Sequence, residues 1–502
     1  MKKRLIYNTL LLTGVSLYMR TLSLLFQVYV SNKIGASGIG LFTLIISVQA
    51  LAVTLATSGI RYAVTRLVSE ELGMGRPGGV DKVMKSCFSY AAFFSTLALG
   101  VLYFGADYIG SVWVRDTRTV LSLKILAFGL PFLSLCSVMG GYFTAVQKVM
   151  KYSIVQIFEQ LCMIGFTMLL IPGIPEGRLD LACAALVAAA AMADAASCAL
   201  CFILYRLDKR RFTGPASGAG ITSRLMRMAS PLALSAYARV SLSTLQHLLV
   251  PGGLRKSGIS ADYALASYGV IQGMVFPVLF FPSAFFLSIS ELLIPELTEA
   301  QVSGNTVKME RIVNRILSLC LNFSIAAAGI IYAFGDELGT SLYSTPEAGR
   351  YIKILAPLIV IMYMDTVTDG MLKGLGQQLY AMVINIADAF ISVVLVFFLL
   401  PIWAIRAYIF IIFLTELFNF SLSILRLSRV VNIKIGFMDF LKPGACVIAS
   451  ISFTLPLMRF IGLHLAPNLL SSSLHIAVCV LLYTVLMRYV FHAKEKIKNP
   501  LL

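Results

Sequence analysis

The chain has 502 residues, of which 58% are hydrophobic and only 13% are charged, and its formal net charge is +17. These fractions lie outside the range of soluble globular proteins, so the sequence predicts an integral membrane protein. The excess of Lys and Arg is expected to reflect membrane topology and attraction to anionic lipids, which argues against a nucleic-acid-binding protein.

Apolar stretches of about 20 residues, the length that crosses a bilayer as a helix, recur along the whole chain. The expected spans are 5–31, 38–65, 86–112, 120–146, 152–172, 180–205, 228–250, 262–292, 312–341, 351–372, 379–401, 403–425, 440–461 and 471–491. The predicted fold is therefore an all-α polytopic membrane protein with about 14 transmembrane helices.

The loops on the side of the N-terminus hold most of the Lys and Arg residues under this assignment. By the positive-inside rule, both termini are expected to be cytoplasmic. The nine cysteines, Cys198 and Cys201 included, lie in or beside apolar spans, where they indicate small-residue packing rather than a disulfide framework. Neither a metal nor a cofactor is expected.

The first span carries an arginine near its middle. Ser16, Arg20, Ser23 and Gln27 follow one another at spacings of three or four residues and therefore share one helix face. Placing a guanidinium at the centre of a bilayer costs at least about 2.5–3.5 kcal/mol, so such a residue normally faces a watery cavity or an anionic partner.

The two halves of the chain contain matching residues, which indicates an internal repeat. The matching residues are 219 positions apart in the first helix of each copy and 229 positions apart after it, because the second copy has about ten extra residues in the loop that follows. The matching pairs are Ser16 and Ser235, Arg20 and Arg239, Gln27 and Gln246, Lys124 and Lys353, Gly141 and Gly370, and Glu159 and Asp388. Each copy has an even number of spans, so the copies share one orientation and are related by an axis along the membrane normal.

The expected architecture is two pseudo-symmetric six-helix lobes followed by two further helices. The expected parts are an N-lobe at 1–205, a basic cytoplasmic linker at 206–227, a C-lobe at 228–427, and a region at 428–502 that holds the last two spans and a basic cytoplasmic tail.

Substrate sites of repeat transporters lie at the seam between the copies, where Arg20 and Arg239 are predicted to line one cavity. Two cations without an acid on either helix suit an anionic ligand, although pairing with backbone carbonyls or with an acid of the same lobe is the alternative. Arg61 either guards the cavity entrance or extends to the membrane interface. The candidate substrate-binding residues are Arg20, Arg239, Ser16, Ser23, Gln27, Ser235, Gln246 and Arg61.

Acidic residues inside spans are a second set of candidates. Asp365, Asp369 and Lys373 share one face of the tenth span, where an ion pair between Asp369 and Lys373 is favoured over a metal-bound diphosphate site, because no second acidic motif occurs. The candidates for proton or cation coupling are Asp365, Asp369, Glu159 and Asp388. Asp194 in the sixth span and Glu416 in the twelfth are further acids of this kind, and the alternative for each residue is hydrogen bonding within its lobe. The sequence contains neither HExxH nor GxSxG, so no enzyme activity is expected.

The stretch from Arg20 to Glu71, with GIGLF after the first helix and TSGIRYAVTRLVSEE after the second, resembles the polysaccharide flippase branch of the MOP superfamily, and within it the sporulation flippases. The resemblance implies a MATE-like V of two lobes, alternating access, and transfer of an undecaprenyl-diphosphate-linked sugar to the outer leaflet of the bacterial cell membrane. The sugar would be a precursor of peptidoglycan or polysaccharide, including spore cortex.

The resemblance also implies that the last two spans help to form a groove for the lipid tail. Arg20 matches a central arginine that the lipid II flippases of this superfamily carry in the first helix, whereas Phe26 stands where they carry a second one. The expected partners are a lipid-linked oligosaccharide and membrane lipids, and the expected state is a monomer.

Two other functions remain open at this point. A cation-coupled multidrug exporter would share the fold, but such exporters typically carry an acid in the first helix, and no Asp or Glu precedes Glu70 here. A membrane prenyl-diphosphate transferase built on Asp365 and Asp369 is the more remote alternative.

Overall fold

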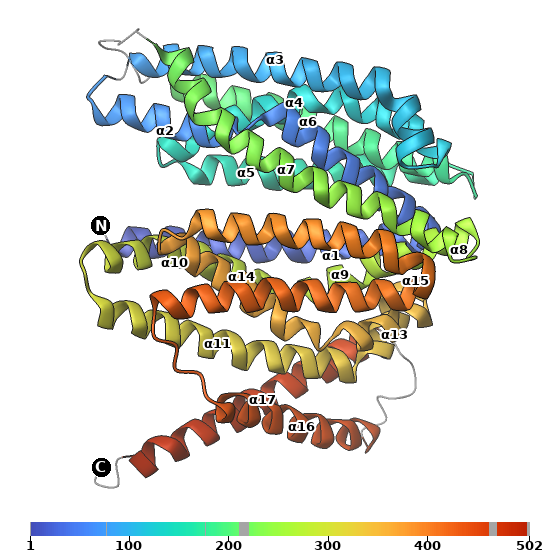
Figure 1. Ribbon diagram of the computed structural model, residues 1–502, viewed down its shortest axis with the longest axis vertical. Helices are drawn as coiled ribbons and strands as arrows, with labels where there is room; N and C mark the ends of the chain where they lie inside the picture. Colours follow the sequence, from blue (N-terminus) through green and yellow to red (C-terminus); the bar gives the residue numbers. More distant parts are fainter. Residues whose placement is uncertain (1, 77, 176, 210–219, 461–468, 499–502) are drawn as a thin grey trace. The chain divides into compact units, whose positions relative to one another are not determined.

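The computed structural model describes residues 2–76, 78–175, 177–209, 220–460 and 469–498. Over these ranges the chain consists of helices and short connections without a β-strand, which confirms the predicted all-α fold (Figure 1). In these ranges, ten helices are long and apolar enough to cross a membrane, or eleven if α13 (Pro346–Leu355) and α14 (Leu358–Gly374), bent by 59°, form one span.

This number agrees roughly with the 14 predicted spans because two of the helices each cover a pair of them. The first, α1 (Lys2–Thr57), is broken at Gly35, whose φ of 69° and ψ of 178° are accessible only to glycine. The second, α15 (Gln378–Val430), is broken at Ala404, shortly after Pro401. The seventh predicted span corresponds to α7 (Ile221–Lys256), which is not among these ten helices.

The helices form two compact units. Unit 1 comprises Met1–Gly35 and Ser267–Leu502, and unit 2 comprises Ala36–Ala266. These units differ from the expected lobes, because the first half of α1 packs with the second half of the chain and α7 packs with the first half. Residues 206–209 and 220–227 of the expected basic linker belong to unit 2, and its middle part, 210–219, lies outside the described residues.

Unit 2 is a helical bundle around an apolar core. Besides the second half of α1, α7 and the start of α8 (Ala261–Gly269), it contains α2 (Ile60–Gly73), α3 (Gly79–Tyr108), η1 (Ile109–Trp113), η2 (Thr117–Thr119), α4 (Val120–Ala145), α5 (Val149–Leu170), η3 (Ile171–Gly173) and α6 (Leu179–Lys209). Val64, Met84 and Tyr142 are buried in its core, and Leu225 of α7 belongs to the same cluster.

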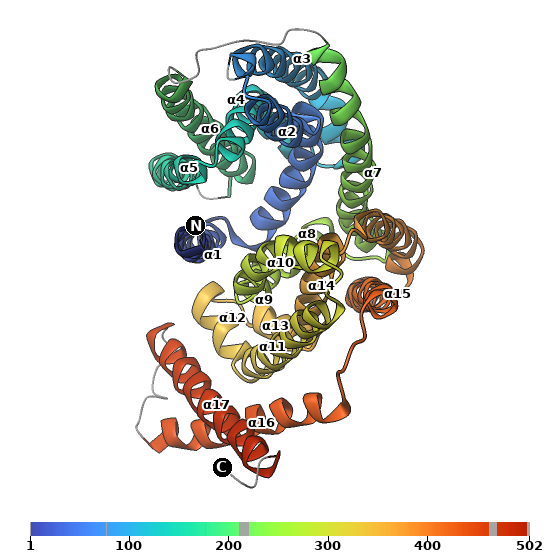
Figure 2. The ribbon, with the colours of Figure 1, turned by 90° about the vertical axis from the view of Figure 1, so that its left-hand side faces the viewer.

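Polar contacts along the whole length of α7 fasten this helix within unit 2. Near its start, Arg224 forms ion pairs with the neighbouring carboxylates of α2, including Glu71 at 3.4 Å. In its middle, Tyr237 and Ser58 share a hydrogen bond between their hydroxyls, and Thr244 Oγ1 donates to a main-chain carbonyl of α1 at 2.9 Å. In both views α7 runs alongside α2 and α3 (Figures 1 and 2).

Unit 1 contains the first half of α1 and most of the second half of the chain. Its remaining elements are the end of α8, η4 (Val270–Val275), α9 (Phe276–Phe280), α10 (Ala284–Val302), α11 (Thr306–Ala333), α12 (Gly335–Tyr343), α13, α14, α15, α16 (Phe437–Phe460) and α17 (Leu469–Lys498). The two last helices pack against α11 through a cluster that includes Ile330, Phe334, Val447, Cys479 and Tyr483 (Figure 2).

The internal repeat is visible in the contacts of each unit. In unit 2, Lys124 Nζ lies 2.8 Å from a carboxylate oxygen of Asp107. In unit 1, Lys353 forms an ion pair with Asp336. The two lysines are a predicted repeat pair, and their partners occupy matching positions, so the same interaction occurs once in each copy.

Candidate functional site

Arg20 lies in the first half of α1, within unit 1, and is half-buried. Its guanidinium is within electrostatic reach of Tyr363 on α14, whose hydroxyl donates to the carbonyl of Leu279 at 2.5 Å. Among the residues of unit 1 that the structure describes, no Asp or Glu is ion-paired with Arg20. Among the described side chains of unit 1, this positive charge therefore has no carboxylate counter-ion.

Arg239 is the corresponding arginine of unit 2 and lies exposed on α7. Tyr237 and Thr244, seven residues apart, mark the face of α7 that packs against α1. Two residues turn an α-helix by about 200°, so Arg239 and Gln246 lie on the side away from that packed face. Within the described part of unit 2, no carboxylate forms an ion pair with Arg239.

The other predicted polar residues of the first helix have different surroundings. Ser23 is exposed, whereas Gln27 Nε2 donates to the carbonyl of Gly273 in η4 at 2.9 Å. The side chain of Ser16 lies outside the described part of the chain. Gln27 therefore has a structural contact in addition to its predicted role at the substrate. On α7, Ser235 is partly buried.

Arg61 is held by an aromatic ring. Its guanidinium carbon lies 4.8 Å from the centroid of the Tyr152 ring on α5, within the range of a cation–π interaction. The residue remains exposed to its surroundings. The geometry gives Arg61 a defined orientation but assigns it neither to a cavity entrance nor to the membrane interface.

The acidic residues of unit 1 divide into a paired residue and a cluster. Asp369 accepts a hydrogen bond from Lys373 Nζ at 2.6 Å, which confirms the predicted pair. One turn earlier, Asp365 lies within electrostatic reach of Asp388, and Glu416 lies within reach of both. One oxygen each of Asp365 and Asp388 is buried without a hydrogen-bond partner among the described residues. These three residues are called the acidic cluster below.

Glu416, an acid of the twelfth predicted span that is also a candidate for coupling, belongs to this cluster. Its neighbour Asn419, three residues on, donates through Nδ2 to Oδ1 of Asn385 at 3.1 Å, and Asn385 in turn precedes Asp388 by three residues. The two halves of α15 thus each present an amide and a carboxyl on one face.

Unit 2 contains a smaller polar group at the matching place. Glu159 and Asp194 lie within electrostatic reach of one another. Ser197 Oγ donates to the main-chain carbonyl of Asp194 at 3.0 Å and lies 3.9 Å from Cys136 Sγ. Cys136 occupies the repeat position of Asp365, so the third carboxyl is present only in unit 1. Across the described residues, no group of three or more His, Cys, Asp or Glu is arranged to hold a metal ion.

An apolar cavity of about 530 Å³ lies within unit 1, between α1, α9, α11, α12 and α17. Its lining residues include Leu24, Leu25, Phe281, Ala327, Ile330, Ile476 and Val480, with Thr21, Ser341 and Ser472 among the few polar ones. Such a lining suits a hydrocarbon chain. The last helix contributes directly to the cavity, while α16 packs on α11 and α17.

Several known proteins are similar to this chain in sequence and in fold. Residues 5–301 match the family model described as polysaccharide biosynthesis protein, and residues 257–398 match the MatE model. Stage V sporulation protein B of Bacillus subtilis (strain 168) is 22% identical over 404 residues, which cover 79% of this chain and 78% of that protein. Lipid II flippase MurJ of the same organism is 23% identical over 426 residues, which cover 79% and 77%.

A solved structure extends this likeness to the fold. Lipid II flippase MurJ in an inward closed conformation matches with a TM-score of 0.74 at 11% sequence identity, over 96% of this chain and 99% of that chain. The likeness covers the last two helices as well as the repeats.

Proposed function

This chain belongs to the polysaccharide biosynthesis protein family, and we propose that it carries an undecaprenyl-diphosphate-linked sugar from the inner to the outer leaflet of the bacterial cell membrane by alternating access. The resemblance to MOP-superfamily flippases that the sequence indicated is confirmed, and the chain is a multi-pass membrane protein. The nature of the lipid-linked sugar, including a role in spore cortex, is part of the proposal.

The observation that carries the proposal is the pair of repeat-related arginines. Arg20 and Arg239 each lie in a helix that the sequence predicts to span the membrane, and neither has a carboxylate partner in the described part of its own unit. A guanidinium matches phosphate oxygens with two parallel hydrogen bonds, so each of these arginines suits a phosphate group of the substrate. A sugar headgroup that moved through hydrocarbon would lose its hydrogen bonds to water, at a cost of several kcal/mol for each polar group. A polar passage through the protein would avoid this cost.

The apolar cavity of unit 1 supports the lipid part of the substrate. Its volume of about 530 Å³ and its lining by α1 and α17 suit one stretch of a polyprenyl chain. This assignment gives α17, which lies outside the repeat and lines the cavity, a role in holding the lipid tail.

The acidic cluster is the proposed coupling site. A carboxylate inside a membrane protein without a paired cation is stable only when it is protonated or when it binds a cation. Asp365 and Asp388, with Glu416, meet this condition, whereas Asp369 is paired with Lys373. Glu159 of unit 2 is the weaker candidate, since only Asp194 accompanies it. An inside-negative membrane potential adds a second driving force of about 2.3 kcal/mol per negative charge for each 100 mV.

Transport by the purified protein in liposomes tests the proposal. An undecaprenyl-diphosphate-linked disaccharide is placed in one leaflet of the liposome membrane, and an impermeant galactosyl-transferring enzyme is added on the other side. The rate at which the disaccharide becomes accessible to this enzyme is measured. We expect a protein-dependent rate that falls when the potential is collapsed. A rate equal to that of empty liposomes, together with sodium-dependent extrusion of a cationic dye, would identify a multidrug exporter instead.

The proposed topology places both termini in the cytoplasm and the proposed working form is a monomer. Positive charges on the side of the N-terminus support this orientation. Protease accessibility of a C-terminal tag in sealed inverted vesicles would test it independently of transport.

A further inference from the structure

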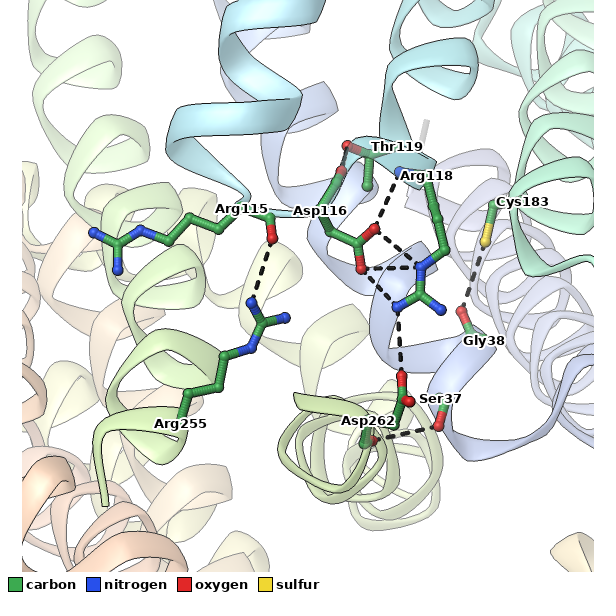
Figure 3. Close-up of polar contacts among 9 residues, drawn as sticks. All are labelled: Ser37, Gly38, Arg115, Asp116, Arg118, Thr119, Cys183, Arg255 and Asp262. Atoms are coloured by element: carbon green, nitrogen blue, oxygen red, sulfur yellow. Dashed lines mark hydrogen bonds and ion pairs between the residues drawn. The ribbon is translucent and has the colours of Figure 1, made fainter. Parts of the chain in front are cut away.

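Two arginines lie together at the end of unit 2 where α3 and α7 finish (Figure 3). Arg255 Nη1 donates to the main-chain carbonyl of Arg115 at 3.3 Å. A Cβ on Gly252 would lie 3.9 Å from Arg115 Nη1. Gly252 and Arg255 are three residues apart on α7 and are therefore neighbours on its surface. Both guanidiniums thus lie over the last turns of this helix.

The carboxylates of this region are bound to a third arginine. Arg118 is forked onto Asp116, with Nη2 and Oδ2 separated by 2.7 Å, and the same guanidinium lies 3.6 Å from Asp262 Oδ1 (Figure 3). The side chain of Arg115 points away from this group. Within the described part of unit 2, neither Arg115 nor Arg255 forms an ion pair with an Asp or Glu. Two positive charges therefore lie side by side without a counter-ion from the unit.

Arg255 also has a donor for which unit 2 supplies no acceptor. Its Nε is buried, and no hydrogen-bond partner for it occurs among the described residues. A buried donor without an acceptor is costly, so such groups in native proteins are commonly satisfied by a bound molecule. The carbonyl of Arg115 already binds Nη1. The remaining edge of the guanidinium, formed by Nε and Nη2, is the one that matches two oxygens of an anion.

The backbone of Arg115 has a conformation that usually belongs to glycine. Its φ is 59°, in the left-handed region. The turn that closes η1 requires this conformation, since Val114 N donates to the carbonyl of Ile109 and Asp116 N to that of Gly110, both at 2.9 Å. Glycine would make the same turn without strain. Strained residues of this kind cluster at ligand sites, where the side chain is needed.

Exposed aromatic residues place the arginine pair at the level of lipid headgroups. Phe104 on α3 is 83% exposed, Tyr108 at the end of that helix is 60% exposed, and Trp113 is 46% exposed. Tyr and Trp are enriched at the boundary between hydrocarbon and headgroups, whereas an exposed Phe suits the hydrocarbon itself. Arg115 follows Trp113 by two residues, on the headgroup side of that boundary. With the proposed topology, this is the outer leaflet.

We propose that Arg115 and Arg255 bind the phosphate group of a membrane lipid. A phosphate has enough oxygens for both guanidiniums, and its negative charge offsets two like charges that would otherwise repel each other. The acyl chains of the same lipid would lie along the exposed apolar face of α3. Because Arg239 lies 16 residues earlier on α7, about 24 Å along the helix at 1.5 Å per residue, this site is separate from the proposed substrate site.

Native mass spectrometry of the delipidated protein in detergent tests this site. One probe is dioleoylphosphatidylglycerol, which carries a phosphate, and the other is dioleoylglycerol, which has the same acyl chains without one. Inorganic phosphate at millimolar concentration is added as a competitor. We expect one tightly bound phosphatidylglycerol that neither dioleoylglycerol nor inorganic phosphate displaces.

Arg115→Gly and Arg255→Gln should each weaken binding of this lipid about 10- to 100-fold, because each removes a hydrogen bond to a charged group. Arg115→Gly should still fold, since glycine adopts the left-handed conformation without strain. Its thermal unfolding without lipid measures this directly. The control is Arg178→Gln, because this exposed arginine of the same unit is paired with Asp180 at 2.9 Å and should leave lipid binding unchanged.

Wild-type affinity for phosphatidylglycerol in Arg115→Gly and Arg255→Gln would overturn the site. Equally strong binding of dioleoylglycerol, or the same loss in Arg178→Gln, would do so too, since neither result depends on a phosphate held by this arginine pair. Displacement by inorganic phosphate would assign the site to a free anion and overturn its assignment to a lipid. The probes are not the proposed transported substrate, so the outcome is independent of the proposed function.

Discussion

The main-chain carbonyl of Arg61 on α2 lies directly against Gly141 on α4, where a Cβ would be 2.7 Å from its oxygen. The same arrangement recurs in unit 1, where Ser290 on α10 lies against Gly370 on α14. The residues of the two contacts occupy matching repeat positions. Small residues at such crossings let the backbones of membrane helices approach closely.

Gly141→Ala is expected to lower the free energy of unfolding by about 1–3 kcal/mol, because the clashing atom is a backbone oxygen that moves only with its helix. Gly370→Ala should cost less, since the nearest atom is Ser290 Oγ, a side-chain atom that can rotate away at the loss of its hydrogen bond to the carbonyl of Thr366. Unfolding by SDS in mixed micelles measures both. Gly165→Ala on α5, where a Cβ meets no atom within 4 Å, serves as the control. A larger loss in Gly370→Ala than in Gly141→Ala would contradict this ranking.

Replacing Arg20 with Ala should lower the transport rate about 10- to 100-fold, because a hydrogen bond to a charged group contributes about 1.5–3 kcal/mol. Arg20→Lys should recover part of the rate, as it keeps the charge but loses the planar fork. The liposome assay described above measures both, and the free energy of unfolding should change little, since no paired carboxylate is left behind.

Arg239→Ala should lower the rate in the same way but less, because Gln246 remains on the same side of α7 and can donate to a phosphate. Arg178→Ala is the control, since this exposed arginine pairs with Asp180 at 2.9 Å in a loop. Wild-type transport in the single variants of Arg20 and Arg239 and in the double variant would remove both residues from the substrate site.

Asp365→Asn should abolish the dependence of transport on an imposed proton or sodium gradient. Asp369→Asn, one turn away on the same helix, should keep that dependence, because it breaks only an intrahelical pair worth about 0.3–0.5 kcal/mol. Initial rates with and without each gradient measure the difference. If Asp369→Asn lost the dependence and Asp365→Asn kept it, the acidic cluster would not be the coupling site.

Ala327→Trp should fill part of the cavity in unit 1 and weaken binding of undecaprenyl phosphate more than binding of a short prenyl phosphate. Each methylene group withdrawn from water contributes about 0.8 kcal/mol, so the longer chain has more to lose. Leu319→Trp, at an exposed position of the same helix, is the control. Equal loss for the long and the short ligand would show that the cavity does not hold the tail.

The sequence predicted those features that depend on local pattern. Runs of apolar residues located the helices, and the boundary expected between the spans 5–31 and 38–65 agrees with the break at Gly35. The four-residue spacing of Asp369 and Lys373 predicted their ion pair. The match between Lys124 and Lys353 indicated a repeat, and the structure shows that each lysine forms the corresponding ion pair in its own copy.

Features that depend on which helices become neighbours could not be predicted. A transmembrane helix is apolar on most of its faces, so the pattern of its residues does not identify the helix against which it packs. The sequence therefore did not indicate that the first helix packs in unit 1 and the seventh in unit 2. The ring of Tyr152 that holds Arg61 comes from another helix, and so do the carboxyls that face Asp365.

The packing of the first helix with residues beyond Ser267 has a consequence for biogenesis. A ribosome adds about 5–20 residues per second, so roughly 10–50 s separate the membrane entry of this helix from that of its first partners. During this time the nascent helix carries Arg20 into the bilayer without the neighbours that later surround it. An insertase or a translocon must therefore retain the helix, and two half-genes split at the linker would yield a folded protein only if their products exchanged first helices.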